Sequence, residues 1–90
     1  FGELHVHSAL SMDAWLADVR GGPDDVYRFG RGEEVLLPPL DAEGKGTRRA
    51  QLERALDFVA LTDHADFQGE VALCTRADSP VYATAACVLY

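Results

Sequence analysis

The sequence predicts an α/β fold built from successive strand–helix units. Two short apolar segments, at residues 2–7 and 58–61, have the pattern of β-strands, and polar residues that include histidine follow both. A segment with helical character comes after each of these strands. Strands and helices that alternate along a chain are typical of α/β folds with a parallel sheet.

The first predicted strand is GELHVH, which ends near His7. Because successive side chains of a strand point to opposite faces, Leu4 and Val6 face one way, and His5 and His7 face the other. The next stretch, SALSMDAWLADV, is predicted to be either a loop or one irregular helical turn.

The segment GGPDDVYRFGRG predicts a short helix from Pro23 to Phe29. Proline suits the first position of a helix, two aspartates complement its positive end, and glycines terminate it. Residues 33–53 contain two prolines and a glycine-rich polar tip, which favour a β-hairpin excursion between the two strands. Residues 48–55, taken alone, would also suit a helix.

The second predicted strand, Phe58–Leu61, is a continuous apolar run that we expect to be buried on both faces. Such runs are typical of parallel strands covered by helices. The following segment, ADFQGEVALCT, predicts a short helix.

Composition and charge narrow the classes of partner. Apolar residues make up 48% of the chain, which is ordinary for a folded domain, and no window is long and apolar enough for a membrane span. The net charge of −7 argues against nucleic-acid binding. It would also repel a phosphorylated substrate unless bound cations, such as divalent metals, intervened.

Cys74 and Cys87 are the two cysteines of the chain. The sequence favours two buried or free thiols, and a disulfide that closes a short loop is the alternative. A disulfide would indicate an oxidising compartment, and hence a periplasmic or secreted protein rather than a cytoplasmic one.

The spacing of histidines and acidic residues predicts a divalent-metal site. His5 and His7 project from one face of a strand about 7 Å apart, so both imidazoles can reach one ion. Asp13 follows closely, and Thr-Asp-His at residues 62–64 brings His64 from the second strand end. Zinc, manganese and iron accept such ligands, and α/β folds place their sites at the carboxyl ends of strands.

The stretches HVHSALSMDAW and LDFVALTDHADF resemble the first two motifs of the PHP (polymerase and histidinol phosphatase) superfamily. The pattern of that superfamily is His-x-His, then a nearby Asp or His, then Thr-Asp-His. GPDDVYRFGRGEEV and CTRADSPVYATAAC are similar to a large, poorly characterised branch of PHP-like proteins. The resemblance implies a distorted (β/α)7 TIM-like barrel with two or three metal ions at the carboxyl ends of its strands.

The resemblance also implies roles for individual residues. His5, His7, Asp13 and His64 would ligate Mn, Fe or Zn. Asp63 is assigned to the catalytic machinery as the carboxylate that orients an imidazole. Later motifs of the superfamily, with a Glu and further His and Asp ligands, are not matched in this sequence, so we expect residues 1–90 to be the N-terminal part of a single PHP-like domain.

The function implied by this resemblance is divalent-metal-dependent hydrolysis, most often of phosphoesters, through a metal-activated water. The partner would then be a small phosphorylated molecule, and residues 1–90 alone would be inactive. An amidohydrolase-type metal enzyme, which also begins with His-x-His on a first barrel strand, is one alternative. The other is a PHP-like domain that holds a structural metal without catalysis.

Overall fold

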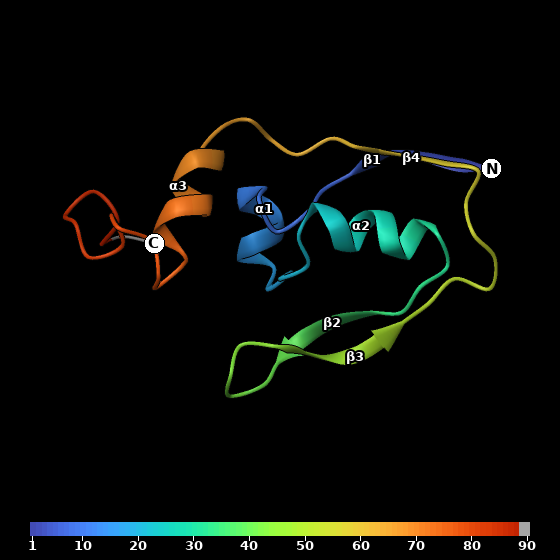
Figure 1. Cartoon of the computed structure of the whole chain (residues 1–90), viewed down its shortest axis with the longest axis horizontal. Helices are drawn as coiled ribbons and strands as arrows, with labels where there is room; N and C mark the ends of the chain where they lie inside the picture. Colours follow the sequence, from blue (N-terminus) through green and yellow to red (C-terminus); the bar gives the residue numbers. More distant parts are fainter. Residues whose placement is uncertain (89–90) are drawn as a thin grey trace.

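The fold pairs two strands that lie far apart in the sequence. β1 (Gly2–Val6) and β4 (Phe58–Leu61) form a parallel two-stranded sheet, and Figure 1 shows them side by side. The computed structural model describes residues 1–88; residues 89–90, which complete the predicted 1–90 domain, lie outside the described residues. The predicted α/β class and the parallel pairing are confirmed.

Two helices and a hairpin occupy the chain between β1 and β4. α1 (Met12–Leu16) provides the short helical turn allowed by the sequence. α2 (Pro23–Gly30) begins at the predicted proline and ends one residue beyond the predicted end. The carboxylate of Asp25 accepts a hydrogen bond from the backbone amide of Gly22 at 3.0 Å, which satisfies a donor at the start of α2.

The predicted hairpin is confirmed. β2 (Val35–Leu40) and β3 (Gly46–Ala50) pair in the antiparallel direction. In the turn, Asp41 Oδ1 accepts hydrogen bonds from the backbone amides of Glu43 and Lys45, both at 2.9 Å. Residues 48–50 belong to β3, so the alternative helix over residues 48–55 does not form.

α2 covers one face of the parallel sheet through a close contact at Gly30. This glycine is buried, and a methyl group on its Cα would collide with the side chain of Val59 in β4. Figure 1 shows α2 between the parallel sheet and the hairpin. The contact requires a residue without a side chain at the end of the helix.

The opposite face of the sheet is exposed among the described residues. Leu4 is 68% exposed and Phe58 is 52% exposed, whereas Val59, Ala60 and Leu61 are half-buried. The prediction that the Phe58–Leu61 run is buried on both faces is therefore wrong. α2 packs against one face only, and no other described element covers the side chains that point the other way.

α3 (Gln68–Cys74) confirms the helix predicted after the second strand. Val71 is 1% exposed, and a disulfide joins Cys74 at the end of α3 to Cys87. The expectation of two thiols is wrong, because the turns after α3 bring Cys87 back against the helix. Among the described residues, no helix has the length and apolar character that crossing a membrane requires.

Candidate metal centre

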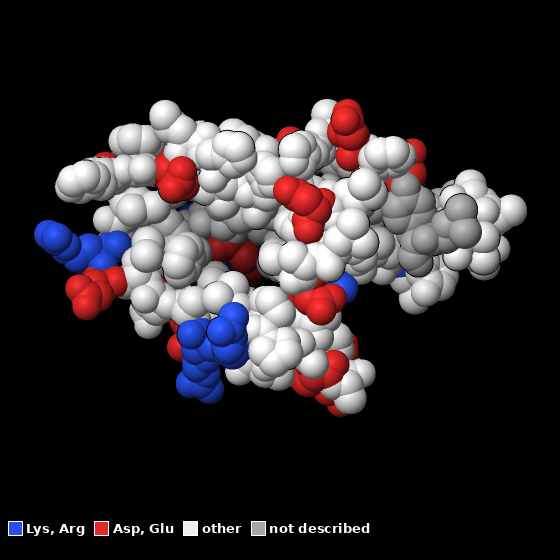
Figure 2. Space-filling model, turned by 180° about the vertical axis from the view of Figure 1, so that it is seen from behind, with Lys and Arg blue, Asp and Glu red and all other residues white. Residues whose placement is uncertain are grey.

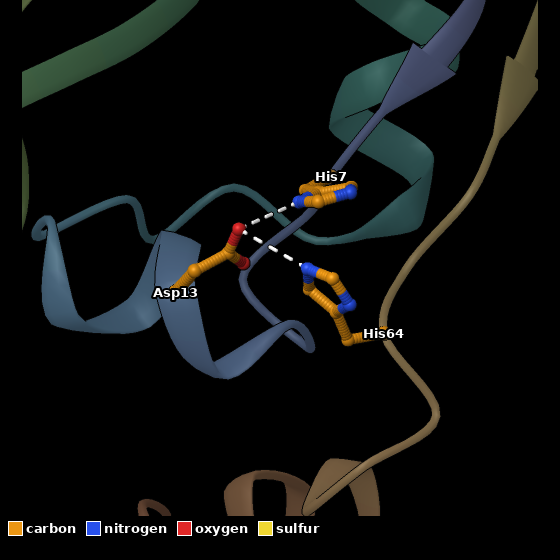
Figure 3. A group of neighbouring side chains, drawn as sticks. All are labelled: His7, Asp13 and His64. Atoms are coloured by element: carbon orange, nitrogen blue, oxygen red, sulfur yellow. Dashed lines mark hydrogen bonds and ion pairs between the residues drawn. The ribbon is translucent and has the colours of Figure 1, made fainter.

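Three of the predicted ligands converge beyond the carboxyl end of the parallel sheet. His7 follows β1 directly, Asp13 lies in α1, and His64 lies in the loop after β4. Figure 3 shows their side chains pointing toward one another from these three segments. Parallel strands end at the same edge of a sheet, which brings residues more than fifty positions apart into one cluster.

The ligand atoms of the cluster lie close together. His7 Nδ1 is 2.9 Å from Asp13 Oδ2, and His64 Nε2 is 3.4 Å from the same oxygen. One ligand atom from each of the three residues lies within 4.8 Å of the others. With metal–ligand bonds of about 2.0–2.2 Å, two ligands lie about 3.0 Å apart on an octahedral edge and about 3.4 Å apart on a tetrahedral one. Both distances to Asp13 Oδ2 are therefore those expected of two ligands on a single ion.

The donor set and its exposure also fit a metal with an open coordination position. Two imidazoles and one carboxylate form a ligand type found in catalytic zinc sites, where a water or substrate takes the fourth place. The side chain of His7 is 17% exposed, whereas those of Asp13 and His64 are about half exposed. The cluster is thus held on one side by the protein and open to solvent on the other.

The imidazoles favour the charged form of Asp13. Desolvation raises the pKa of its carboxyl group, but hydrogen bonds from His7 and from the backbone amide of Ala14 outweigh that effect, with a further contribution from the charge of both imidazoles. The net result is a pKa below the ordinary value of an aspartate. A carboxylate that remains ionised is the form that binds a cation.

His5 lies beside the cluster and outside it. Its ring centroid is 4.9 Å from that of His7, as the shared strand face predicts, but it does not join the group formed by His7, Asp13 and His64. The ring of His7 also meets that of His64, with centroids 4.4 Å apart. His7 is therefore the central imidazole of the three.

A buried hydrogen-bond network holds the two strand-end loops together. Ser8 donates its backbone amide to Asp63 Oδ1 at 2.5 Å and its hydroxyl to Asp63 Oδ2 at 2.6 Å. Ser11 donates its hydroxyl to Asp63 Oδ1 at 2.8 Å, and the same hydroxyl accepts a hydrogen bond from the His64 amide at 2.7 Å. Both serines are completely buried. The network fixes the backbone next to both imidazoles.

The hydrogen-bond partners of Asp63 differ from the predicted ones. We expected its carboxylate to orient an imidazole, yet both carboxylate oxygens accept hydrogen bonds from Ser8 and Ser11. Partial burial raises the pKa of Asp63, but these hydrogen bonds and the charge of His7 outweigh it, and the pKa falls below the ordinary value. A catalytic role for Asp63 stays a prediction, and the contacts present are those of a positioning residue.

Ser8 and Ser11 were not among the predicted site residues. Both appear in the sequence as small polar residues after a strand, which is an ordinary loop composition. The one signal available in the sequence was position: Ser8 directly follows the predicted ligand His7, and its partner Asp63 directly precedes the predicted ligand His64. Nothing in their spacing identifies a partner more than fifty residues away.

A comparison with protein families assigns the chain to one of them. Residues 1–89 match the family described as "Protein of unknown function (DUF3604)". The chain belongs to this family. The whole candidate centre of this DUF3604 chain, from His7 to His64, lies inside the matched range, as does His5. No curated protein and no solved structure matched the chain.

Two hollows adjoin the cluster in this DUF3604 chain. The smaller, of about 240 Å³, is lined by Met12, Asp13, His64, Asp66 and Phe67. The larger, of about 560 Å³, reaches His5 and His7 from the side of α2. A small molecule bound at the cluster therefore has space next to it.

Proposed function

We propose that this chain belongs to a divalent-metal-dependent hydrolase that acts on phosphoesters. The observation that carries the proposal is the convergence of His7, Asp13 and His64 from three separate segments, with one ligand atom of each residue within 4.8 Å of the others. The resemblance of the HVHS and LTDH stretches to the PHP superfamily supports a phosphoester substrate.

The proposed architecture is a distorted (β/α)7 barrel, of which residues 1–90 supply the N-terminal strand–helix units. The parallel pairing of β1 with β4 supports this, as does the position of the cluster beyond the carboxyl ends of both strands. The ions would be Mn, Fe or Zn, two or three in number, with further ligands from later strands of the barrel.

The chemistry of the proposed centre divides between the ions and the chain. Bound divalent ions would supply Lewis-acid activation of a water and neutralise the charge of the phosphoryl group. His7 and His64 would provide imidazole ligands, and Asp13 would provide the carboxylate. Ser8, Ser11 and Asp63 would keep the two strand-end loops at a fixed separation, so that the ligands meet the ions without rearrangement. His5 would contact an ion adjacent to His7.

The disulfide supports a proposal on compartment. Disulfides form and persist in oxidising environments and are rare in the cytosol. Because Cys74 and Cys87 are paired and both are buried, we place the protein in the periplasm or outside the cell. The partner would be a small phosphorylated molecule, since the net charge of −7 disfavours nucleic acid.

The experiment that tests the function is a metal-dependent activity panel on the full-length protein. Metal-depleted protein, reloaded separately with Mn²⁺, Fe²⁺ and Zn²⁺, should hydrolyse phosphate mono- or diesters, and His64→Ala should abolish turnover. Turnover of amides alone would favour the amidohydrolase alternative. Stoichiometric metal without turnover would favour a structural metal, and the absence of bound metal would refute all three.

A further inference from the structure

The described residues surround an apolar pocket between the parallel sheet, α2 and the hairpin. Its volume of about 560 Å³ lies within the range of pockets that hold small organic ligands, about 300–1,000 Å³. Figure 2, which views the molecule from behind, shows a hollow near the middle of that face, with atoms of acidic residues recessed in it. The apolar walls come from α2, from the hairpin with the segment after it, and from β4: Val26, Phe29, Val35, Leu37, Leu52 and Val59.

One wall of the apolar pocket is shared with the candidate metal centre. His5 in β1 and His7 directly after it line the pocket, and His7 Nδ1 lies 2.9 Å from Asp13 Oδ2 in the centre. The pocket and the centre are therefore adjacent, with His7 common to both. The apolar side chains named above are half-buried, so a ligand that covered them would remove apolar surface from water.

The charges around the apolar pocket restrict what can enter it. Its lining includes the carboxylates of Glu3 and Asp25, and no lysine or arginine stands among the described residues that line it. Arg28 pairs with Asp25 at 3.3 Å but is not part of the lining. A second anionic group would meet the carboxylate of Glu3 and no lysine or arginine among the lining residues that the structure describes, whereas an uncharged apolar group would meet walls of valine, leucine and phenylalanine.

We propose that the apolar pocket binds the organic group of the substrate, and that this group is an uncharged aryl group. The inference rests on the proposed function, because the phosphoryl group would be held at the candidate metal centre. The preferred substrates would be aryl phosphate esters with a single phosphoryl group, and nucleotides with several phosphates would be disfavoured because no lysine or arginine of the described lining could receive the further phosphates.

The test compares two phosphonates, which resemble phosphate esters but are not hydrolysed. Isothermal titration of metal-loaded full-length protein should give phenylphosphonate an affinity at least about tenfold higher than methylphosphonate, from the apolar surface that the ring covers. Val26→Asn, which places an amide in the pocket wall, should remove most of that preference. Tyr27→Asn is the matched control, since Tyr27 is the next residue of α2, is 40% exposed and does not line the pocket.

The possible outcomes distinguish a failure of this inference from a failure of the proposed function. Stoichiometric metal binding with equal affinity for the two phosphonates overturns the apolar pocket as an aryl site and leaves the proposed function standing; that result is expected if a second copy or another part of the protein fills the groove. Absence of metal binding refutes the proposed function and this inference with it. If Val26→Asn does not fold, Ala50→Leu narrows the pocket, and an unchanged preference for the phenyl group in a folded, metal-binding Ala50→Leu protein refutes the inference.

Discussion

Ser8 donates two hydrogen bonds to Asp63, one from its backbone amide and one from its hydroxyl, across a separation of 55 residues. Ser8 directly follows His7, and Asp63 directly precedes His64. The contact therefore joins the chain within one residue of each imidazole in the candidate metal centre. Because both oxygens of the carboxylate are used, this pairing specifies the register of the two loops as well as their distance.

Replacing Asp63 by asparagine should destabilise the protein. The amide nitrogen of the new side chain cannot accept a hydrogen bond, so a buried donor of Ser8 or Ser11 would lose its acceptor, and the remaining hydrogen bonds would lose the charge of the carboxylate. We expect the free energy of unfolding to fall by about 1–3 kcal/mol, measured by urea denaturation of the metal-free protein. Asp66→Asn is the control, because Asp66 is exposed; an equal loss in both variants would contradict the role of the network.

The stability contributed by Asp63 should depend on pH. Its folded-state pKa lies below the ordinary value of 3.8, so the unfolded chain takes up a proton at higher pH than the folded one. The contribution is present above the unfolded pKa and is lost as pH falls through the folded pKa. When unfolding is measured between about pH 6 and pH 3, the difference in the free energy of unfolding between wild type and Asp63→Asn should become smaller as the pH falls. A difference that stays constant over this pH range would show that the ionised carboxylate is not the source of the stabilisation.

Gly30→Ala should destabilise the protein by disturbing the packing of α2 against β4. The added methyl group meets the Val59 side chain, and overpacking of this kind costs about 1–3 kcal/mol. Thermal unfolding should show a clear loss of stability, which Val59→Ala in the same protein should partly restore. Gly69→Ala in α3 is the matched control, since no heavy atom lies within 4 Å of the added carbon; it should be neutral or stabilising. Similar losses at both glycines would contradict the packing described.

Removing the disulfide should lower stability without disturbing the metal ligands. The link closes a segment with a sequence separation of 13, for which chain entropy predicts about 3 kcal/mol. The Cys74→Ser, Cys87→Ser double variant should therefore unfold at lower urea concentration than wild type. Titration of the unfolded wild type with a thiol reagent, in the absence of a reductant, provides an independent check. Reactive thiols at Cys74 and Cys87 in that titration would show that the pair is not oxidised.

The sequence predicted what depends on local pattern. The helix from Pro23 was predicted from a proline and two aspartates, and the hairpin from two prolines and a glycine-rich polar tip. The alternation of side chains placed His5 and His7 on one face, which their ring separation of 4.9 Å confirms. Each of these features is decided by residues within a few positions of one another.

What the sequence did not predict depends on contacts across the fold. The exposure of Phe58 follows from α2 covering only one face of the sheet, which no local pattern specifies. The pairing of Cys74 with Cys87 depends on how the chain turns after α3. Ser8 and Ser11 acquire their importance from Asp63, whose sequence neighbours gave no indication of them.

The central claim is that His7, Asp13 and His64 together bind a divalent ion. Isothermal titration of metal-depleted full-length protein with Zn²⁺ or Mn²⁺ tests it most directly, with His7→Ala and His5→Ala compared side by side. Because His7 belongs to the three-residue cluster and His5 lies outside it, His7→Ala should weaken binding by well over the roughly 10–100-fold typical of changes to residues that only orient a ligand, and His5→Ala should weaken it less. No saturable metal binding in the wild type, or equal losses in the two variants, would contradict the account.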